Sequence, residues 1–147
     1  MGSHIVIRQY RATDLGAVLD LWDRASRIAH PFLDDAFLAD ERRRLAHDWL
    51  PKSEVYVAES ARRVVGFLAL SGDEIGGLFV HPDHQRNGAG TELVDHTRKT
   101  HPTLEVEVFE ANPIGRSFYD ARGFVPIGRR VDDDTGRTVI RLRLEEK

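Results

Sequence analysis

The segment from residue 75 to residue 91 constrains the fold of this chain more than any other. It reads Ile-Gly-Gly-Leu-Phe-Val-His-Pro-Asp-His-Gln-Arg-Asn-Gly-Ala-Gly-Thr. Its apolar first half lacks helical spacing, which predicts a strand that ends before Pro82. A glycine-rich turn at Gly88 and Gly90 then leads into a predicted helix. Such a turn predicts an anion site, because glycine admits close backbone approach and the first amides of a helix lack partners. The residues that recur at the helical interval are Ala89, Leu93, Val94 and Thr97.

This turn has to be distinguished from two other phosphate-binding motifs. A nucleotide-binding P-loop continues with lysine and then serine or threonine, whereas Gly90 is followed directly by Thr91. A dinucleotide fingerprint needs three spaced glycines, which the segment lacks. The pattern that is present is Gln85-x-x-Gly88-x-Gly90. An ordinary strand-to-helix turn also produces it, so the rest of the chain decides between a ligand loop and a plain turn.

The composition bounds the class of protein. With 147 residues, of which 41% are hydrophobic and 31% charged, the chain fits a soluble globular domain, which we expect to be a single domain over residues 4–147. Its longest apolar run, residues 64–70, is too short to cross a bilayer. A net charge of −3 gives no basic footprint for nucleic acid. Because cysteine is absent, a disulfide framework, a thiolate metal site and a cysteine acyl-enzyme are excluded.

The first residues carry no targeting signal. The sequence Met-Gly-Ser-His lacks the basic and apolar regions of a signal peptide. We expect residues 1–3 to be a tag remnant or a disordered start, and we expect a cytoplasmic location.

Periodicity predicts an alternation of strands and helices. The paired glycines at 76 and 77 are costly within a strand unless a bulge or a ligand needs the space. The element order predicts an α/β fold with a mixed central sheet of about seven strands and four helices, parallel only in its βαβ portions. The predicted order is a strand at 5–10, helices starting near 14 and 34, strands at 55–58, 64–70 and 75–80, a helix at 89–99, a strand at 104–108, a helix at 112–123, and strands at 124–130 and 138–144.

A second motif lies in the helix predicted after the fifth strand. It comprises Asn112, the pair Phe118-Tyr119 and the pair Gly123-Phe124. Asn112 and Tyr119 are seven residues apart, so they lie about 20° from each other around a helix and can face the same ligand. The alternative is that the tyrosine is a core aromatic residue and the asparagine only a helix cap. The expected packing face beside them consists of Ile114, Phe118 and Ala121.

Together, the two motifs and the element order resemble the GCN5-related N-acetyltransferases (GNAT) over essentially the whole chain. In that family, the Gln-x-x-Gly-x-Gly turn holds the pyrophosphate of acetyl-coenzyme A, and the later helix carries the asparagine and the Phe-Tyr pair. The His-Pro-Phe-Leu sequence at residues 30–33 is similar to that of small bacterial members. The resemblance implies a GNAT-like acyl-CoA N-acyltransferase fold and acetyl-CoA as the cosubstrate.

The resemblance also implies roles for individual residues. Tyr119 would be the acid that protonates the departing thiolate, as a phenol beside the sulfur can. Backbone amides near Phe79 and Val80 would hold the thioester oxygen. Arg86 stands where relatives often carry glycine, which leaves the contacts of the loop open. The implied coenzyme contacts are Phe79, Val80, Gln85, Arg86, Asn87, Gly88, Ala89, Gly90, Thr91, Asn112, Ser117 and Tyr119.

The residue that takes a proton from the acceptor amine is less defined. An alkyl ammonium with a pKa near 10.4 must lose its proton before it can attack. His30 is the first candidate, because imidazole titrates near neutrality and the loop after the first helix often lines the acceptor side of this fold. Glu74 and Glu107 are alternatives, although each of the three also fits a purely structural role. His81 and His84 lack a third ligand at suitable spacing, so no metal site is predicted.

The resulting hypothesis is an acetyltransferase that moves acetyl from acetyl-CoA to a primary amine by direct attack in a ternary complex. A non-catalytic acyl-CoA sensor or interaction subunit is the alternative from another class. A toxin that acetylates aminoacyl-tRNA ranks lower because the net charge is acidic, although residues 42–44 are three arginines. The acceptor stays open among polyamines, antibiotics, amino acids and protein amino termini, because fold does not fix substrate. Other acyl groups also stay open, as do a monomer and a homodimer.

Overall fold

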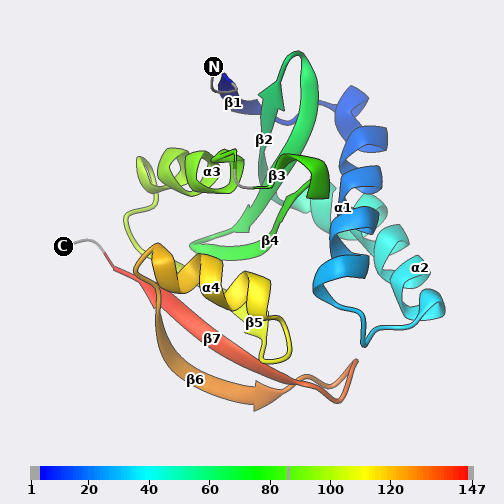
Figure 1. Cartoon of the computed structure of the whole chain (residues 1–147), viewed down its shortest axis with the longest axis vertical. Helices are drawn as coiled ribbons and strands as arrows, with labels where there is room; N and C mark the ends of the chain where they lie inside the picture. The colour runs from blue at the N-terminus through cyan, green and yellow to red at the C-terminus, as the bar shows by residue number, and fades with distance from the viewer. Residues whose placement is uncertain (1–3, 86, 146–147) are drawn as a thin grey trace.

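A computed structural model describes residues 4–85 and 87–145 and contains one mixed sheet with the strand order β1-β2-β3-β4-β5-β7-β6 (Figure 1). Neighbouring strands are antiparallel except β4 and β5, which run parallel. For the described residues, the predicted α/β class with seven strands and four α-helices is confirmed. Arg86 and the predicted disordered start at residues 1–3 lie outside the described residues. The elements are β1 (Ile5–Gln9), α1 (Leu15–Ala29), α2 (Asp35–Arg44), β2 (Glu54–Ser60), β3 (Arg63–Ser71), β4 (Glu74–Val80), α3 (Ala89–Arg98), β5 (Leu104–Phe109), α4 (Pro113–Ala121), β6 (Val125–Val131) and β7 (Thr138–Leu144).

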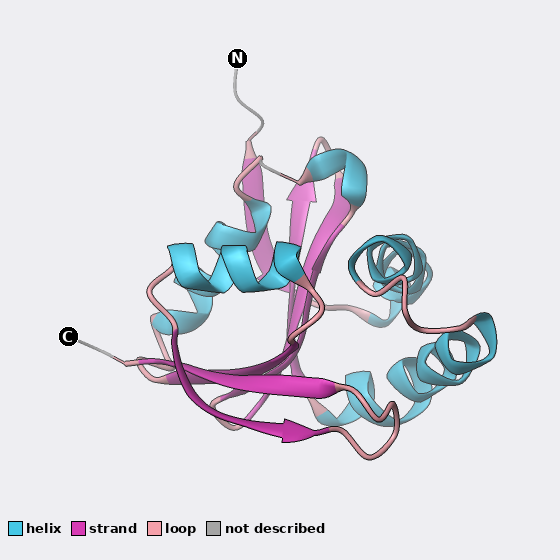
Figure 2. Cartoon of the chain, turned by 60° about the horizontal axis from the view of Figure 1, so that its bottom comes forward, coloured by secondary structure: helices cyan, strands magenta, loops and turns pink. Residues whose placement is uncertain are grey.

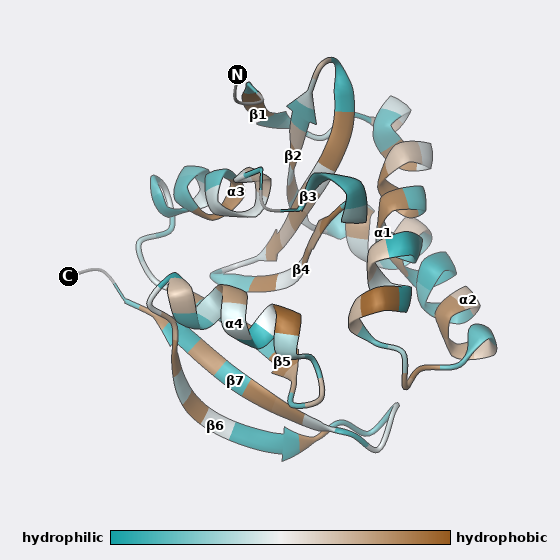
Figure 3. Ribbon diagram, in the orientation of Figure 1, coloured by the Kyte–Doolittle hydropathy of each residue, from teal (hydrophilic) through white to brown (hydrophobic). Residues whose placement is uncertain are grey.

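The helices cover both faces of the sheet (Figure 2). Helices α1 and α2 pack on one face, where the core includes Val57 and Phe67. Helices α3 and α4 pack on the other face, over Leu68 and Val106. Strand β3 lies in the middle and is buried on both faces, in agreement with its hydrophobic colouring in Figure 3. Burial of these two apolar layers positions the ends of β4 and β5 between the two pairs of helices.

Strands β4 and β5 separate soon after they begin. Among the described residues, they pair only through Glu74 with Glu105 and Ile75 with Val106. Both strands continue well beyond these pairs. The divergence leaves backbone groups along one edge of β4 without a strand partner, and such an edge can bind a ligand as an added strand.

A β-bulge explains the paired glycines of β4. In the register of β3 and β4, Ala69 lies opposite Gly77 and Leu70 lies opposite Ile75, so Gly76 has no partner on β3. A bulge bends a strand and increases its local twist. It falls beside the point where β4 turns away from β5, and it bears out a bulge, one of the two explanations that the glycine pair left open.

His101 contacts two carboxylates near this junction. Nδ1 of His101, in the connection between α3 and β5, lies 3.0 Å from Oδ1 of Asp73 in the β3–β4 turn. Its Nε2 lies 3.3 Å from Oε1 of Glu54, at the start of β2. Both nitrogens donate at once only when the imidazole is protonated. The hydrogen bond with Asp73 is the main cause that raises the pKa of His101.

We expect His101→Ala to lower the free energy of unfolding by about 1 kcal/mol or less, and only on the acid side. The pKa of His101 is higher in the folded chain than its unfolded value of about 6.5, so protonation stabilises the folded state. This contribution is complete below about pH 6.5 and is lost as the pH rises through the raised folded-state pKa. Denaturant unfolding of both chains at about pH 5.5 and about pH 9 measures the difference.

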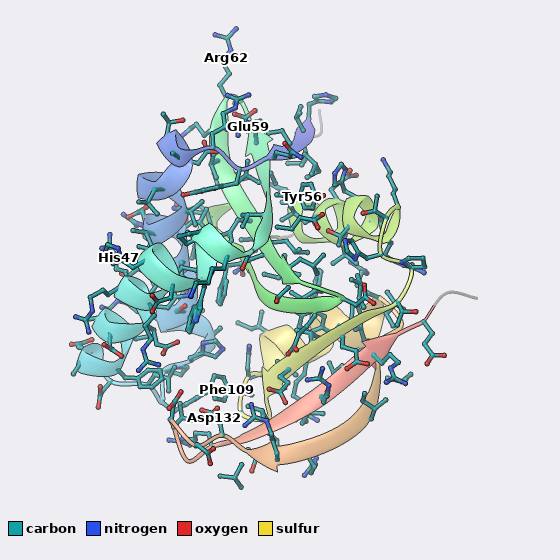
Figure 4. The ribbon with its side chains drawn as sticks, turned by 180° about the vertical axis from the view of Figure 1, so that it is seen from behind. His47, Tyr56, Glu59, Arg62, Phe109 and Asp132 are labelled. Atoms are coloured by element: carbon teal, nitrogen blue, oxygen red, sulfur yellow. The ribbon has the colours of Figure 1, made fainter. Side chains whose placement is uncertain are left out.

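The control for this prediction is His47→Ala, which removes an exposed histidine on the outer side of the molecule (Figure 4). It should leave the free energy of unfolding unchanged at both pH values. An equal loss of unfolding free energy for His101→Ala in acid and in base would contradict stabilisation by the protonated imidazole.

Candidate active site

A cavity of about 660 Å³ lies between the end of β4, the amino end of α3 and helix α4. Its volume is that of a small-molecule site. Two predicted coenzyme contacts are not among its lining residues: Asn87 is exposed elsewhere on the turn, and Arg86 lies outside the described residues. All the others line the cavity: Phe79, Val80, Gln85, Gly88, Ala89, Gly90, Thr91, Asn112, Ser117 and Tyr119.

The amino end of α3 presents backbone donors to this cavity. Gly88 caps the helix in the left-handed conformation, with φ of +87°. Its carbonyl accepts a hydrogen bond from the amide of Glu92 at 2.9 Å. The amides of Ala89, Gly90 and Thr91 precede this first helical bond, so they have no partner within the helix. Together with the positive end of the helix dipole, they suit the oxygens of an anionic ligand.

The two glycines of this turn are needed for different reasons. A Cβ on Gly88 would meet no atom within 4 Å, but the positive φ strains any other residue. A Cβ on Gly90 would lie 3.0 Å from Cε1 of Phe118 on α4. Gly90 therefore lets α3 and α4 approach each other, and a side chain there would crowd the Phe118 ring in the cavity wall.

The backbone of β4 supplies a further donor. The amide of His81 donates to the carbonyl of Val65 on β3 at 2.7 Å. Alternate residues of an antiparallel strand point to the same neighbour, so the amide of Val80 points away from β3, toward the space left by β5. Nε2 of Gln85 donates to the carbonyl of Val80 at 3.3 Å and holds the strand end against the turn. Of the two predicted amides near the thioester, that of Val80 faces the gap and that of Phe79 points to β3.

Asn112 both caps α4 and lines the cavity, so the two interpretations of this residue are compatible. Its Oδ1 accepts a hydrogen bond from the amide of Gly115 at 3.0 Å and caps α4. Its Nδ2 lies 3.3 Å from Nε2 of His30. A Cβ on Gly115 would lie 2.6 Å from Nδ2 of Asn112, so glycine is required beside this cap. Asn112 therefore fixes the start of α4 and joins it to the end of α1, while it also lines the cavity.

Tyr119 is the one buried residue of α4, a helix that the structure describes throughout. It is 7% exposed, and its ring packs against those of Phe118 and Phe124 at centroid distances of 5.2 and 5.1 Å. Burial raises the pKa of Tyr119, so the phenol stays protonated at neutral pH. A protonated phenol in a cavity wall can donate a hydrogen bond or a proton to a bound group.

The predicted packing face of α4 is wrong for two of its three members. Ile114 is 47% exposed and Ala121 is exposed, whereas Phe118 packs partly buried against the core. Helix α4 covers the sheet with the side that carries Tyr119, and Ile114 borders the open cavity. Helical periodicity alone does not separate a face that packs on protein from a face that borders a cavity.

Among the lining residues that the sequence analysis did not assign to the coenzyme, two have polar side chains, Arg122 and His84. The guanidinium of Arg122 donates to Oγ1 of Thr91 and lies 5.3 Å from the ring centroid of Phe118. It brings positive charge to the amino end of α3, where an anionic ligand would form a charge-assisted hydrogen bond. The sequence signal that could have identified Arg122 is helical spacing, because Arg122 follows Tyr119 by three residues and so lies on the same side of the helix.

His30, the first candidate for the base, ends α1 beside the cavity wall. Its ring centroid lies 5.0 Å from that of Phe109 and 5.7 Å from that of Phe32. Burial lowers the pKa of His30 to about 4, so the imidazole is neutral at pH 7. Such a weak base is poorly matched to an ammonium group. The role of His30 as the base stays a prediction, and its low pKa counts against that role.

The two glutamates considered as bases lie away from the cavity. Glu74 begins β4, about 20 Å of extended strand from the cavity end, and lies 3.4 Å from Arg141. Glu107 pairs with Arg130 at 2.9 and 2.6 Å, and this hydrogen bonding lowers the pKa of Glu107. Neither glutamate lines the cavity, so the structure does not bring either of them to Tyr119.

The histidine pair in the turn after β4 does not form part of a larger ligand group. The ring centroids of His81 and His84 are 5.6 Å apart. Within residues 4–85 and 87–145, no group of three or more histidine or acidic side chains could hold a metal ion. Over the same residues, every helix is too short or too polar to span a bilayer.

Comparisons with known proteins show the family to which this chain belongs. The family model of an acetyltransferase (GNAT) domain matches residues 51–126. The peptidyl-lysine N-acetyltransferase YjaB of Salmonella typhimurium is 34% identical over 141 residues, which are 95% of this chain and 97% of that protein. The solution structure of apo-form YjaB from Escherichia coli has a TM-score of 0.86 at 31% identity and covers 98% of this chain and 99% of its own. The PaiA N-acetyltransferase of Thermoplasma acidophilum, solved in complex with coenzyme A, shares the fold with a TM-score of 0.74 at 15% identity, over 98% of this chain and 99% of its own.

The chain therefore belongs to the GNAT acetyltransferase family. It is an acyltransferase of the N-acetyltransferase class. The family, the fold and the enzyme class that the two sequence motifs imply are confirmed.

Proposed function

We propose that this chain transfers acetyl from acetyl-CoA to the ε-amine of a lysine in a peptide or protein. The observation that carries the proposal is that the free amides at the start of α3 and the protonated Tyr119 line one cavity. Membership of the GNAT family supports acetyl-CoA as the donor. The lysine acceptor is supported by the 34% identical relative, which is named a peptidyl-lysine N-acetyltransferase.

In this proposal, the chain holds the coenzyme mainly through its backbone. The amides of residues 89–91 donate to the pyrophosphate, and Arg122 adds its charge beside them. The amide-bearing arm of the coenzyme runs along the unpaired edge of β4 and pairs with it as an added strand. The carbonyl oxygen of the thioester then lies near the amide of Val80, which stabilises negative charge on that oxygen.

Direct attack by the amine follows from this arrangement. The lone pair of the amine forms a C–N bond with the thioester carbon, and the electrons of the C=O bond move to the oxygen beside Val80. When the intermediate collapses, the C–S bond breaks and the thiolate accepts a proton from Tyr119. The proton released by the attacking amine returns to the phenolate through solvent. Because the chain has no cysteine, a cysteine acyl-enzyme does not contribute.

We expect the purified chain to release coenzyme A when acetyl-CoA is supplied with an amino-terminally blocked peptide that contains one lysine. Mass spectrometry should show one added acetyl group on that lysine. The same peptide with arginine in place of lysine serves as the control and should give only background release.

Two outcomes would contradict different parts of the proposal. Transfer to a polyamine or a free peptide amino terminus, but not to the lysine peptide, would overturn the lysine assignment. Binding of acetyl-CoA in calorimetry without transfer to any of these amines would overturn the enzymatic function and favour an acyl-CoA sensor.

A further inference from the structure

His30 begins the His-Pro-Phe-Leu sequence, and the proposed chemistry gives it no task. It is not among the residues that line the cavity, but its Nε2 lies 3.3 Å from Nδ2 of Asn112, which does line it. We infer that His30 is a positioning residue, which fixes the amide of Asn112 so that one N–H of that amide serves the amide-bearing arm of the coenzyme. The inference rests on the proposed function, and it gives His30 a role other than that of a base.

The contacts of Asn112 determine which way its side-chain amide faces. The backbone amide of Gly115 is a donor, so the atom of Asn112 that meets it at 3.0 Å has to be the carbonyl Oδ1. Nδ2 therefore faces His30, and because an NH2 group only donates, Nε2 of His30 is the acceptor. A flipped Asn112 amide would set its NH2 group against the N–H of Gly115. The cap of α4 and the contact with His30 thus select the same orientation.

The contact with Asn112 also determines where the imidazole of His30 carries its proton. A ring nitrogen that accepts a hydrogen bond is unprotonated, so the neutral ring holds its proton on Nδ1. Burial lowers the pKa of His30 to about 4, which keeps the ring neutral and its Nε2 able to accept at neutral pH. The low pKa that counts against a base therefore suits an acceptor.

Packing against three rings holds the imidazole in place. Its centroid lies 5.0 Å from that of Phe109, 5.7 Å from that of Phe32 and 6.5 Å from that of Phe79. These rings come from the end of β5, the α1–α2 connection and the end of β4, and Figure 4 labels Phe109. A side chain that is already packed loses little conformational freedom when it accepts a hydrogen bond. His30 can therefore orient Asn112 at a small entropic cost.

The oriented amide of Asn112 keeps one donor for a ligand. Its NH2 group has two N–H bonds, and over residues 4–85 and 87–145 His30 is the one partner of Nδ2. Asn112 is 6% exposed and lines the cavity, as Tyr119 does. A buried donor is costly to leave unpaired, so the second N–H favours a ligand that brings an acceptor. The carbonyl groups of the amide-bearing arm are such acceptors.

The test compares coenzyme A with 3′-phospho-ADP, which keeps the diphosphate but lacks the amide-bearing arm. We expect His30→Phe to weaken the binding of coenzyme A in calorimetry about fivefold or more, through one misplaced hydrogen bond. The binding of 3′-phospho-ADP, measured by competition, should be unchanged. Phenylalanine keeps an aromatic ring beside Phe32 and Phe109 but offers Asn112 no acceptor. A general distortion of the cavity would weaken both ligands.

Two further variants separate positioning from packing. Glutamine can place its carbonyl oxygen near the position of Nε2, so His30→Gln should regain most of the affinity for coenzyme A that His30→Phe loses. Asn112→Ser keeps a helix cap but removes the NH2 group, so it should weaken coenzyme A binding by itself. Adding His30→Phe to Asn112→Ser should then cause no further loss, because both substitutions act on one contact. Additive losses, or no recovery in His30→Gln, would overturn the positioning role.

Nitrogen-15 correlation spectra of the histidine rings test the tautomer directly. The signals of His30 are those that disappear in His30→Phe. At neutral pH and without ligand, we expect the proton of this ring on Nδ1 and a bare Nε2. A proton on Nε2 would overturn the inference.

The outcomes separate this inference from the proposed function. If the unaltered chain binds neither coenzyme A nor 3′-phospho-ADP, the coenzyme cavity is wrongly assigned and both proposals fail. If coenzyme A binds but His30→Phe keeps the full affinity, or weakens both ligands alike, the positioning role of His30 is overturned while the coenzyme site stands.

Discussion

Tyr119→Phe is expected to lower kcat for acetyl transfer at least tenfold while the affinity for acetyl-CoA stays near that of the unaltered chain. The substitution removes one hydroxyl from a buried ring that packs between Phe118 and Phe124, so the packing is preserved. General acid catalysis contributes about 10² to 10⁴ in rate, and the thiolate would then leave without a proton from the wall of the cavity.

Steady-state kinetics with the lysine peptide and calorimetry with acetyl-CoA together check this prediction. Tyr56→Phe is the matched control, because it removes a tyrosine hydroxyl that bonds Glu54 on β2, outside the cavity (Figure 4). A kcat within twofold of the unaltered chain would remove Tyr119 from the chemistry. A parallel loss of coenzyme affinity would instead indicate that the hydroxyl serves binding.

Gly90→Val is expected to weaken the binding of coenzyme A at least tenfold. The new Cβ would lie 3.0 Å from Cε1 of Phe118, tighter than an ordinary contact, and the valine methyl groups add to the overlap, so the Phe118 ring and the start of α3 have to shift relative to each other. The amides that begin α3 would then shift relative to the edge of β4, and a single diphosphate could no longer meet all of them. Calorimetric titration with coenzyme A measures the loss.

The control for this variant is Gly16→Val, because Gly16 is the second residue of α1, as Gly90 is of α3. A Cβ at Gly16 meets nothing within 4 Å, so coenzyme affinity should be unchanged. Circular dichroism establishes that both variants are folded. Unaltered affinity in a folded Gly90→Val chain would show that the spacing of the two helices does not shape the site.

The residues that line the cavity could be predicted from sequence because they are local. The turn at residues 85–91 and the helix from Asn112 to Tyr119 are each contiguous, and glycine, cap and spacing rules act over a few residues. The fold followed for a related reason: strands and amphipathic helices alternate clearly, and the glycine pair at 76 and 77 marked the bulge. In these segments, local preference and final structure agree.

The contacts that join the α1–α2 connection, the end of β5 and the β6–β7 hairpin could not be predicted in the same way. The ring of Phe32 meets that of Phe109, and Arg137 lies over Phe32, although these residues are far apart in the chain. No short-range pattern encodes such contacts. Glu74 shows the opposite error, since a strand carboxylate has the chemistry of a base, but its strand position directs it into an ion pair with Arg141. The residue type of Glu74 suggested a base, but only its position in the folded sheet shows that it lies away from the cavity.

The early separation of β4 from β5 has a consequence for how such a protein changes over time. In the proposed function, recognition of an amide-bearing arm by the edge of β4 uses peptide groups that every residue possesses, so replacing side chains along the strand would not erase it. Substitution is constrained mainly where a glycine permits the bulge or the close approach of two helices. Sequences of this architecture can therefore diverge widely, and adapt their acceptor surfaces, while the donor is still held by the same main-chain atoms.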